Sequence, residues 1–368
     1  MRRATRAILG SAVLGGFALL TAGQAQAALA APTAAPAAAG AVAQYGFAFA
    51  DQPSNPSYVA NARMSTNSTG GTNTVIRYRA GDYEVRMPGL GATPGGNVQV
   101  SAYGDHANRC KTTYWLPLDG AMAVGVMCHN PSGTLADTQF TVQFHRGSND
   151  LRQQSAYLLA HPPVSGAPDA RYSFNSGGAP NTVTKTGTGS WTVDFGSGFT
   201  KLGGVVHVSA YGFNANYCKV RSWGVRAADV RCFTAAGQPT DTAWSLRYTD
   251  RHLPNGFAEL GGYVWANQPS APVGVPYSPD ARHSFNMQGG EVNTVTRDGT
   301  GRYRVRLSRI PAFDQGNPIV TAHGASSAVC SVTELFSSGS SAAIDVDCQT
   351  PAGTPVDSAF TFSHATNR

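Results

Sequence analysis

The chain is poor in charge and contains very little glutamate. Charged residues make up 13% of its 368 positions, against about 25% in an average soluble domain, and the glutamates are Glu84, Glu259, Glu291 and Glu334. This low charge, together with plentiful Val, Tyr, Phe and Thr, excludes a disordered chain and a charged coiled coil. Six cysteines in a chain of this length also exclude a cysteine-dense miniature scaffold.

Two kinds of segment that mark common partners are missing. The sequence has no cluster of lysine and arginine, so it lacks the electrostatic footprint of a protein that binds nucleic acid or an anionic membrane. Beyond the N-terminal region it has no apolar run of the ~20 residues that a membrane-spanning helix needs. We therefore expect no nucleic-acid partner and no membrane span in the rest of the chain.

Motifs of the common enzyme classes are missing as well. The sequence contains no G-x-S-x-G, no H-E-x-x-H and no G-x-x-x-x-G-K, which removes the α/β-hydrolase nucleophile, the zinc-protease site and the phosphate-binding loop. Its cysteines and histidines are not clustered at the short spacing of a redox or zinc site. We expect no catalytic residue, no cofactor and no metal.

The N-terminus carries a targeting pattern. Three arginines within the first six residues precede an apolar stretch over 7–20 and an Ala-Gln-Ala site at 25–27. This order predicts a cleaved secretory signal peptide over 1–27 and an extracellular product. The competing interpretation, a permanent membrane anchor, needs ~20 apolar residues, and the stretch has about 14. Cleavage removes three arginines and no acidic residue, which lowers the net charge from +6 to +3.

After the signal comes a linker and then a threefold repeat. Residues 28–44 are almost wholly Ala, Pro and Gly and are predicted to be a flexible linker. The stretches at 100–104, 208–212 and 320–324 align, and a cysteine follows each of them by six residues. The predicted repeats are residues 45–155, 156–261 and 262–368, each of about 108 residues.

Within a copy the apolar residues recur with a period of two, which is typical of half-buried strands. Val98, Val100 and Ala102 alternate with polar positions, and glycine-rich turns separate such runs. About eight short strands per copy predict an all-β protein of three tandem antiparallel β-sandwich-like modules. The alternative is a single six-bladed β-propeller with two blades per repeat.

The cysteines come as one pair per copy, spaced 18, 14 and 18 residues apart. In an exported chain this pattern predicts one disulfide bond within each repeat rather than a metal or redox site. The predicted bonds are Cys110–Cys128, Cys218–Cys232 and Cys330–Cys348.

Two recurring positions are candidates for ligand binding. One is occupied by an aromatic side chain in every copy and the other by an aspartate four residues after a glycine turn. The aromatic residues either fill the core or stack on sugar rings, and each aspartate either caps a turn through backbone N–H groups or binds calcium or a sugar. The candidates are Tyr103, Tyr211 and His323, and Asp137, Asp241 and Asp357.

A recurring arginine accompanies these positions in every copy. Arg63, Arg171 and Arg282 each precede an asparagine by four residues. We expect each arginine to pair with the aspartate or with that asparagine within its own module, in a structural role.

Part of the second copy carries a resemblance. The stretch TGTGSWTV at 186–193, with Val-Arg-Cys at 230–232 and the Gly237, Asp241 and Trp244 that follow, resembles a module of uncharacterised secreted β-repeat proteins from high-GC Gram-positive bacteria. The resemblance covers all three repeats and implies a secreted or cell-surface protein without assigned chemistry.

The functional expectation is therefore a secreted, non-enzymatic repeat protein with a structural or surface-binding role, its partner a cell-wall or other extracellular glycan. Three similar modules would raise the avidity of weak single sites. The alternative is a carbohydrate-directed hydrolase or an extracellular enzyme inhibitor, because 21 acidic residues leave room for a catalytic carboxylate pair. The sequence leaves the oligomeric state open.

Overall fold

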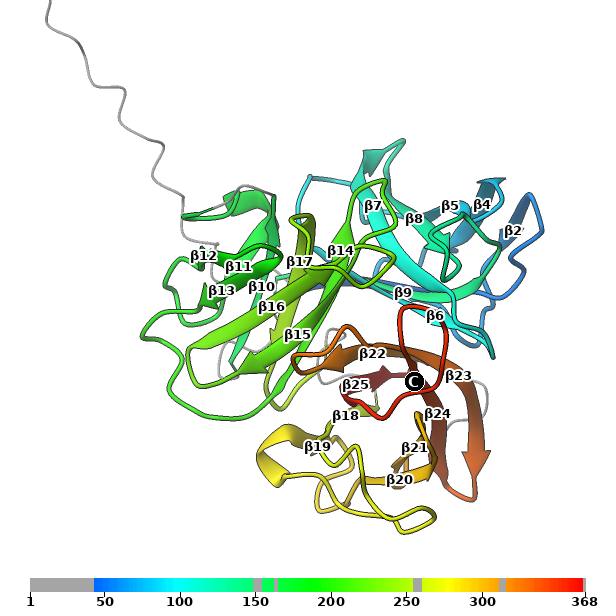
Figure 1. Ribbon diagram of the computed structural model, residues 1–368. Helices are drawn as coiled ribbons and strands as arrows, with labels where there is room; N and C mark the ends of the chain where they lie inside the picture. Colours follow the sequence, from blue (N-terminus) through cyan, green and yellow to red (C-terminus); the bar gives the residue numbers. More distant parts are fainter. Residues whose placement is uncertain (1–42, 148–153, 162–164, 254–259, 311–315, 367–368) are drawn as a thin grey trace, which may run out of the picture. The chain divides into compact units, whose positions relative to one another are not determined.

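A computed structural model describes residues 43–147, 154–161, 165–253, 260–310 and 316–366 (Figure 1). These residues form 25 β-strands and two short 3-10 helices, so the predicted all-β class is confirmed. The predicted signal peptide lies outside the described residues, as does most of the predicted linker. The first strand begins at Gln44, the last residue of that linker.

Three sets of strands correspond to the three repeats, and we call them modules 1, 2 and 3. Module 1 comprises β1 (Gln44–Ala50), β2 (Ser57–Val59), β3 (Thr66–Asn67), β4 (Thr74–Arg79), β5 (Asp82–Pro88), β6 (Asn97–Tyr103), β7 (Arg109–Leu118), β8 (Ala121–His129) and β9 (Gln139–Arg146). Module 2 comprises β10 (Ser155–Ala160), η1 (Ala170–Tyr172), β11 (Ser173–Asn175), β12 (Thr182–Gly187), β13 (Ser190–Asp194), β14 (Val205–Tyr211), β15 (Tyr217–Trp223), β16 (Ala227–Phe233) and β17 (Ala243–Thr249). Module 3 comprises β18 (Gly261–Ala266), η2 (Ala281–His283), β19 (Ser284–Asn286), β20 (Thr294–Gly299), β21 (Arg302–Leu307), β22 (Asn317–His323), β23 (Val329–Ser338), β24 (Ser341–Gln349) and β25 (Ala359–Ala365).

Every module packs as a sandwich around its own apolar core. In module 1 the strands β6, β9 and β1 face β5, β8 and β7, and the rings of Tyr83 and Phe140 meet between them with centroids 5.2 Å apart. The core of module 2 consists wholly of its own residues, whereas Leu159 adds to the core of module 1 and Phe49 and Met64 add to that of module 3. The predicted tandem β-sandwich architecture is therefore confirmed.

The sheets cross from one module to the next. Three sheets have the strand orders β20-β21-β24-β23-β6-β9-β1-β3, β11-β10-β17-β14-β7-β8-β5-β4-β2 and β12-β13-β16-β15-β22-β25-β18-β19. Each combines half of one module with half of another, as the ribbon shows for β23 beside β6 and β14 beside β7 (Figure 1). Since a propeller needs four-stranded blades, these sheets of eight or nine strands show that the propeller alternative is wrong.

The modules join through short parallel pairings, whereas the named strands within each module pair with one another in antiparallel fashion. We call the joints junction 1–2 (β7 with β14), junction 2–3 (β15 with β22) and junction 3–1 (β23 with β6). The paired residues are Thr112 with Tyr211, Val220 with His323, and Val332 with Tyr103. Together the three junctions close a cycle, because module 3 pairs back onto module 1.

Polar side chains fill the region where the modules meet. The hydroxyl of Thr141 donates to the carbonyl of Pro318 at 2.6 Å, and the hydroxyl of Ser245 donates to the carbonyl of Val98 at 2.8 Å. Both hydroxyl-bearing residues are fully buried. We call this region the central interface. The predicted one-sided burial of the strands is wrong here, because the polar face of β6 packs against other modules instead of water.

Candidate functional site

All six cysteines form the disulfide bonds predicted from their spacing. The bonds are Cys110–Cys128, Cys218–Cys232 and Cys330–Cys348. Each joins directly paired residues on adjacent strands of one module. Three such bonds indicate an oxidising, extracellular environment. Among the described residues no helix has the length and hydropathy to span a membrane.

In module 1 the recurring aspartate, Asp137, lies just before β9, and its side chain binds the hairpin formed by β4 and β5. Asp137 accepts hydrogen bonds from the guanidinium of Arg77 at 2.9 and 2.8 Å, from the backbone nitrogen of Gly81 at 3.0 Å and from the hydroxyl of Tyr83 at 3.0 Å. The Arg77 guanidinium holds the pKa of the Asp137 carboxyl below its ordinary value. The turn it caps is that between β4 and β5, not the preceding glycine turn.

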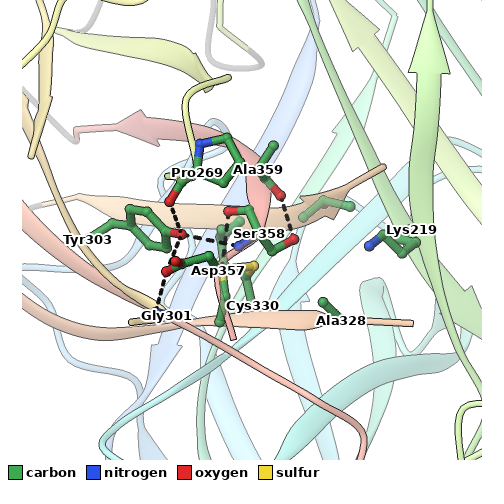
Figure 2. Close-up of a disulfide and its surroundings, with 12 residues drawn as sticks. Lys219, Pro269, Gly301, Tyr303, Ala328, Cys330, Asp357, Ser358 and Ala359 are labelled. Atoms are coloured by element: carbon green, nitrogen blue, oxygen red, sulfur yellow. Dashed lines mark hydrogen bonds between the residues drawn. A yellow bond between two sulfur atoms is a disulfide. The ribbon is translucent and has the colours of Figure 1, made fainter. Parts of the chain in front are cut away.

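The other two aspartates repeat this contact. Asp357 accepts from the guanidinium of Arg297 at 3.0 Å. It also accepts from Gly301 N at 2.8 Å and from the Tyr303 hydroxyl at 3.2 Å (Figure 2). Asp241 accepts from Lys185 and from Gly189 N at 2.8 Å. With their oxygens engaged in this way, the aspartates have a structural capping role, but they cap the hairpin turns at Gly81, Gly189 and Gly301 and not the glycine turns predicted from the sequence. No group of metal ligands occurs in the described part of the chain.

The recurring arginines pair differently from the expectation. Arg171 forms a forked ion pair with Asp169, and Arg282 forms one with Asp280. The recurring asparagine of module 1, Asn67, donates to the side chain of the buried Asn73 at 3.1 Å. Both expected pairings, with the turn-capping aspartate or with the asparagine four residues on, are therefore wrong for Arg171 and Arg282, because each guanidinium binds the carboxylate two residues upstream.

The aromatic candidates occupy equivalent places at the three junctions. The Tyr103 ring packs on Phe49 with centroids 4.6 Å apart, and its hydroxyl accepts from Leu335 N at 3.0 Å. His323 lies edge-on to Trp223 with centroids 5.3 Å apart. Tyr211 lies edge-on to Trp115 at 5.4 Å. All three rings thus contribute to packing between modules.

Junction 1–2 differs because a pocket of module 2 lies beside it. The pocket has a volume of about 310 Å³, at the lower end of the range for small-molecule sites. We call it the junction pocket, and its lining is Leu159, His161, Ala167, Pro168, Asp169, Arg171, Tyr172 and Tyr211. The rings of His161 and Tyr211 lie 5.2 Å apart with planes at 75°, so a ligand would meet both a ring face and a ring edge.

The polar part of the junction pocket is the Asp169–Arg171 pair. Asp169 caps the short helix η1 by accepting from the Arg171 backbone nitrogen at 2.9 Å, and it also binds the guanidinium, whose Nη2 lies 2.6 Å from Oδ2. The Arg171 side chain lowers the pKa of the Asp169 carboxyl. The Arg171 side chain is 63% exposed, so its guanidinium is available to a ligand as well as to Asp169.

The corresponding space at junction 2–3 is filled. Trp265 stands where module 2 has Leu159, and its ring contacts Trp223, His283 and His323 with centroids 5.1 to 5.2 Å away. His283, the counterpart of Tyr172, is 4% exposed. The larger indole therefore occupies the volume that the leucine leaves open at junction 1–2.

Sequence reasoning selected Tyr211 as a candidate and Arg171 in a structural role, but it missed His161, Asp169 and Tyr172 of the junction pocket. A signal was present, since Pro-Asp-Ala-Arg occurs at both 168–171 and 279–282. That tetrapeptide marks the Asp–Arg pair in modules 2 and 3, but it does not distinguish the open pocket from the filled one. The distinction depends on Leu159 against Trp265.

Comparisons of the chain with protein-family models, with curated proteins and with solved structures find no match. The candidate site is therefore defined by its geometry alone.

Proposed function

We propose that this chain is a secreted, non-enzymatic protein that binds an extracellular glycan through the junction pocket. The observation that carries the proposal is the combination of the Tyr172 and Tyr211 rings with the exposed Asp169–Arg171 fork in one open pocket. Aromatic side chains offer an apolar surface to a sugar ring. The fork offers charged donors and acceptors to its hydroxyl groups.

Export is part of the same proposal. A signal peptide over 1–27 would deliver the chain to the environment that three disulfide bonds require. A cell-wall or other extracellular glycan is then the polymer within reach.

The pocket favours binding over hydrolysis of a glycan. Glycoside hydrolases use two carboxyl groups about 5 to 9.5 Å apart across the scissile bond. Among the described residues that line the junction pocket, Asp169 is the one carboxylate, and it is engaged by Arg171. The hydrolase alternative therefore has less support than a binding role.

The experiment is a binding screen of the mature protein on a glycan array, on purified peptidoglycan and on chitin. We expect one glycan class to bind, and Arg171→Gln to weaken that binding roughly tenfold, since a hydrogen bond to a charged group contributes about 1.5 to 3 kcal/mol. The matched control is Arg282→Gln, which alters the equivalent pair at the filled junction and should leave binding unchanged. Flat responses on all three surfaces would overturn the proposal, as would equal losses in the two variants.

A further inference from the structure

A second pocket lies where all three modules meet. Its volume is about 60 Å³, enough for a few waters or for an anion of a few heavy atoms. We call it the central pocket. Equivalent stretches of the three modules line it: 100–102 with 108–111, 208–210 with 217–219, and 320–322 with 328–330.

Two buried lysines line this pocket without a negative partner. Lys111 is 3% exposed and Lys219 is 1% exposed. The Lys111 ammonium donates to Asn214 Oδ1 at 2.7 Å, and the Lys219 ammonium lies 3.4 Å from Ser326 Oγ. In Figure 2 the nitrogen of Lys219 points toward Ala328 and the disulfide of Cys330. Both partners are neutral, so neither balances the charge of an ammonium group.

A buried guanidinium lies beside the lysines. Arg109 is 7% exposed, and its Nε has no hydrogen-bond partner. Its guanidinium lies over the Tyr217 ring at 4.9 Å, and Nη2 donates to the Pro131 carbonyl at 3.1 Å. Within the described residues, none of Arg109, Lys111 and Lys219 forms an ion pair with a carboxylate.

No carboxylate is among the described residues that line the central pocket, and burial disfavours the charged form of the basic groups in it and beside it. Burial lowers the pKa of Lys111 to about 7, and burial with the nearby Arg231 lowers that of Lys219 to about 7. Burial, Lys111 and Arg109 together lower the pKa of His129 to about 4. The charged form of a buried basic group is costly without a counter-charge, and a bound anion would offset that cost and favour the protonated lysines.

We propose that the central pocket binds a small oxyanion, of the phosphate or carboxylate type, against the Arg109, Lys111 and Lys219 side chains that line it. Basic side chains with free donors in one lining match the several oxygens of such a group. The site is independent of the junction pocket. Module 3 has Ser331 at the position of the two lysines, so the pocket is asymmetric and takes one anion per chain.

The test measures thermal unfolding and calorimetric binding of the mature protein at constant ionic strength. Inorganic phosphate, sulfate, acetate and chloride are compared. We expect a saturable rise in Tm as one phosphate or one acetate binds per chain. A response to phosphate assigns the site to oxyanions of the phosphate type, and a response to acetate assigns it to carboxylates. The absence of any saturable response would overturn the proposal, and so would an equal response to chloride.

Two variants show whether the pocket is responsible. Lys219→Ser places in module 2 the residue that module 3 already uses, and it removes a buried cation, so the protein should fold with an unchanged or higher Tm in the absence of anion. We expect its affinity for the oxyanion to fall at least tenfold. Lys201→Ser removes the same charge at an exposed site and should bind like the parent. Equal binding by both variants would contradict the assignment.

Discussion

The hydroxyl of Ser101 accepts a hydrogen bond from the backbone nitrogen of Val320 at 2.9 Å and donates one to the Val320 carbonyl at 3.1 Å, across 219 positions of the chain. Ser209 accepts from Val100 N at 3.0 Å, and Thr321 accepts from Val208 N at 3.3 Å. The three contacts link module 1 to 3, module 2 to 1 and module 3 to 2. Buried hydroxyl groups therefore connect each of the three modules to the other two.

Substituting Ser101 by alanine should destabilise the whole protein. The change removes both hydrogen bonds to Val320 in a buried site, which costs about 1 to 3 kcal/mol. Urea denaturation gives the free energy of unfolding. The control is Ser165→Ala, at an exposed position outside the strands, where we expect a change within about 0.5 kcal/mol. Equal stability of the two variants would contradict a role for the hydroxyl in closing the repeat.

Substituting Asp137 by alanine should cost more stability than the same change at Asp241. Asp137 accepts from Arg77, Gly81 and Tyr83, and losing these bonds costs about 2 to 3 kcal/mol. Asp241 accepts from Lys185 and Gly189 only, because module 2 has a tryptophan where the others have the tyrosine. Chemical denaturation of the two variants measures the difference, and a reversed order would refute the capping role.

Calcium removal should leave the stability unchanged. The oxygens of Asp137 and Asp357 are already engaged by arginine, backbone and tyrosine donors, and calcium needs six to eight oxygen ligands. Thermal unfolding with excess EDTA and with millimolar calcium should give the same Tm. A rise with calcium would restore the calcium interpretation of these positions.

The strands, the disulfide bonds and the repeat could be predicted from the sequence because each depends on local pattern. Period-two alternation identified strands such as β6, and the cysteine pairs fell on neighbouring strands. The central interface could not be predicted in this way. A serine at position 101 has the same local signature whether it faces water or the backbone of a residue 219 positions away.

The candidate site was partly predictable for the same reason. Tyr211 was selected because it recurs as an aromatic position in every copy. Its significance depends on Leu159, which is smaller than Trp265 at the filled junction. That difference matters only because β10 and β14 lie in one sheet, which local pattern does not reveal.

Acid should destabilise the protein through its buried histidines. Burial holds the pKa of His145 and His207 well below 6.5, so below pH 6.5 the unfolded chain binds protons that the folded chain does not. Stability is complete above pH 6.5 and falls as the pH drops. Burial lowers the pKa of His129 and His323 to about 4, in the same direction.

The variant His207→Gln isolates one of these contributions, since Gln99 stands at the equivalent position of module 1. Between pH 6.5 and 5 its loss of stability should be smaller than that of the parent by about 2 kcal/mol. Urea titrations at the two pH values measure the loss. Identical pH dependence of the two proteins would mean that His207 protonates freely in the folded state.

The central pocket is lined by all three modules, and the junction pocket is lined by module 2 beside its junction with module 1, so the account depends on the three copies behaving as one body. Shared sheets and the central interface should make them unfold together. Differential scanning calorimetry of the mature protein tests this directly, because a two-state transition has equal calorimetric and van't Hoff enthalpies. We predict one transition with a ratio near one; three separable transitions, or a ratio approaching three, would contradict the account.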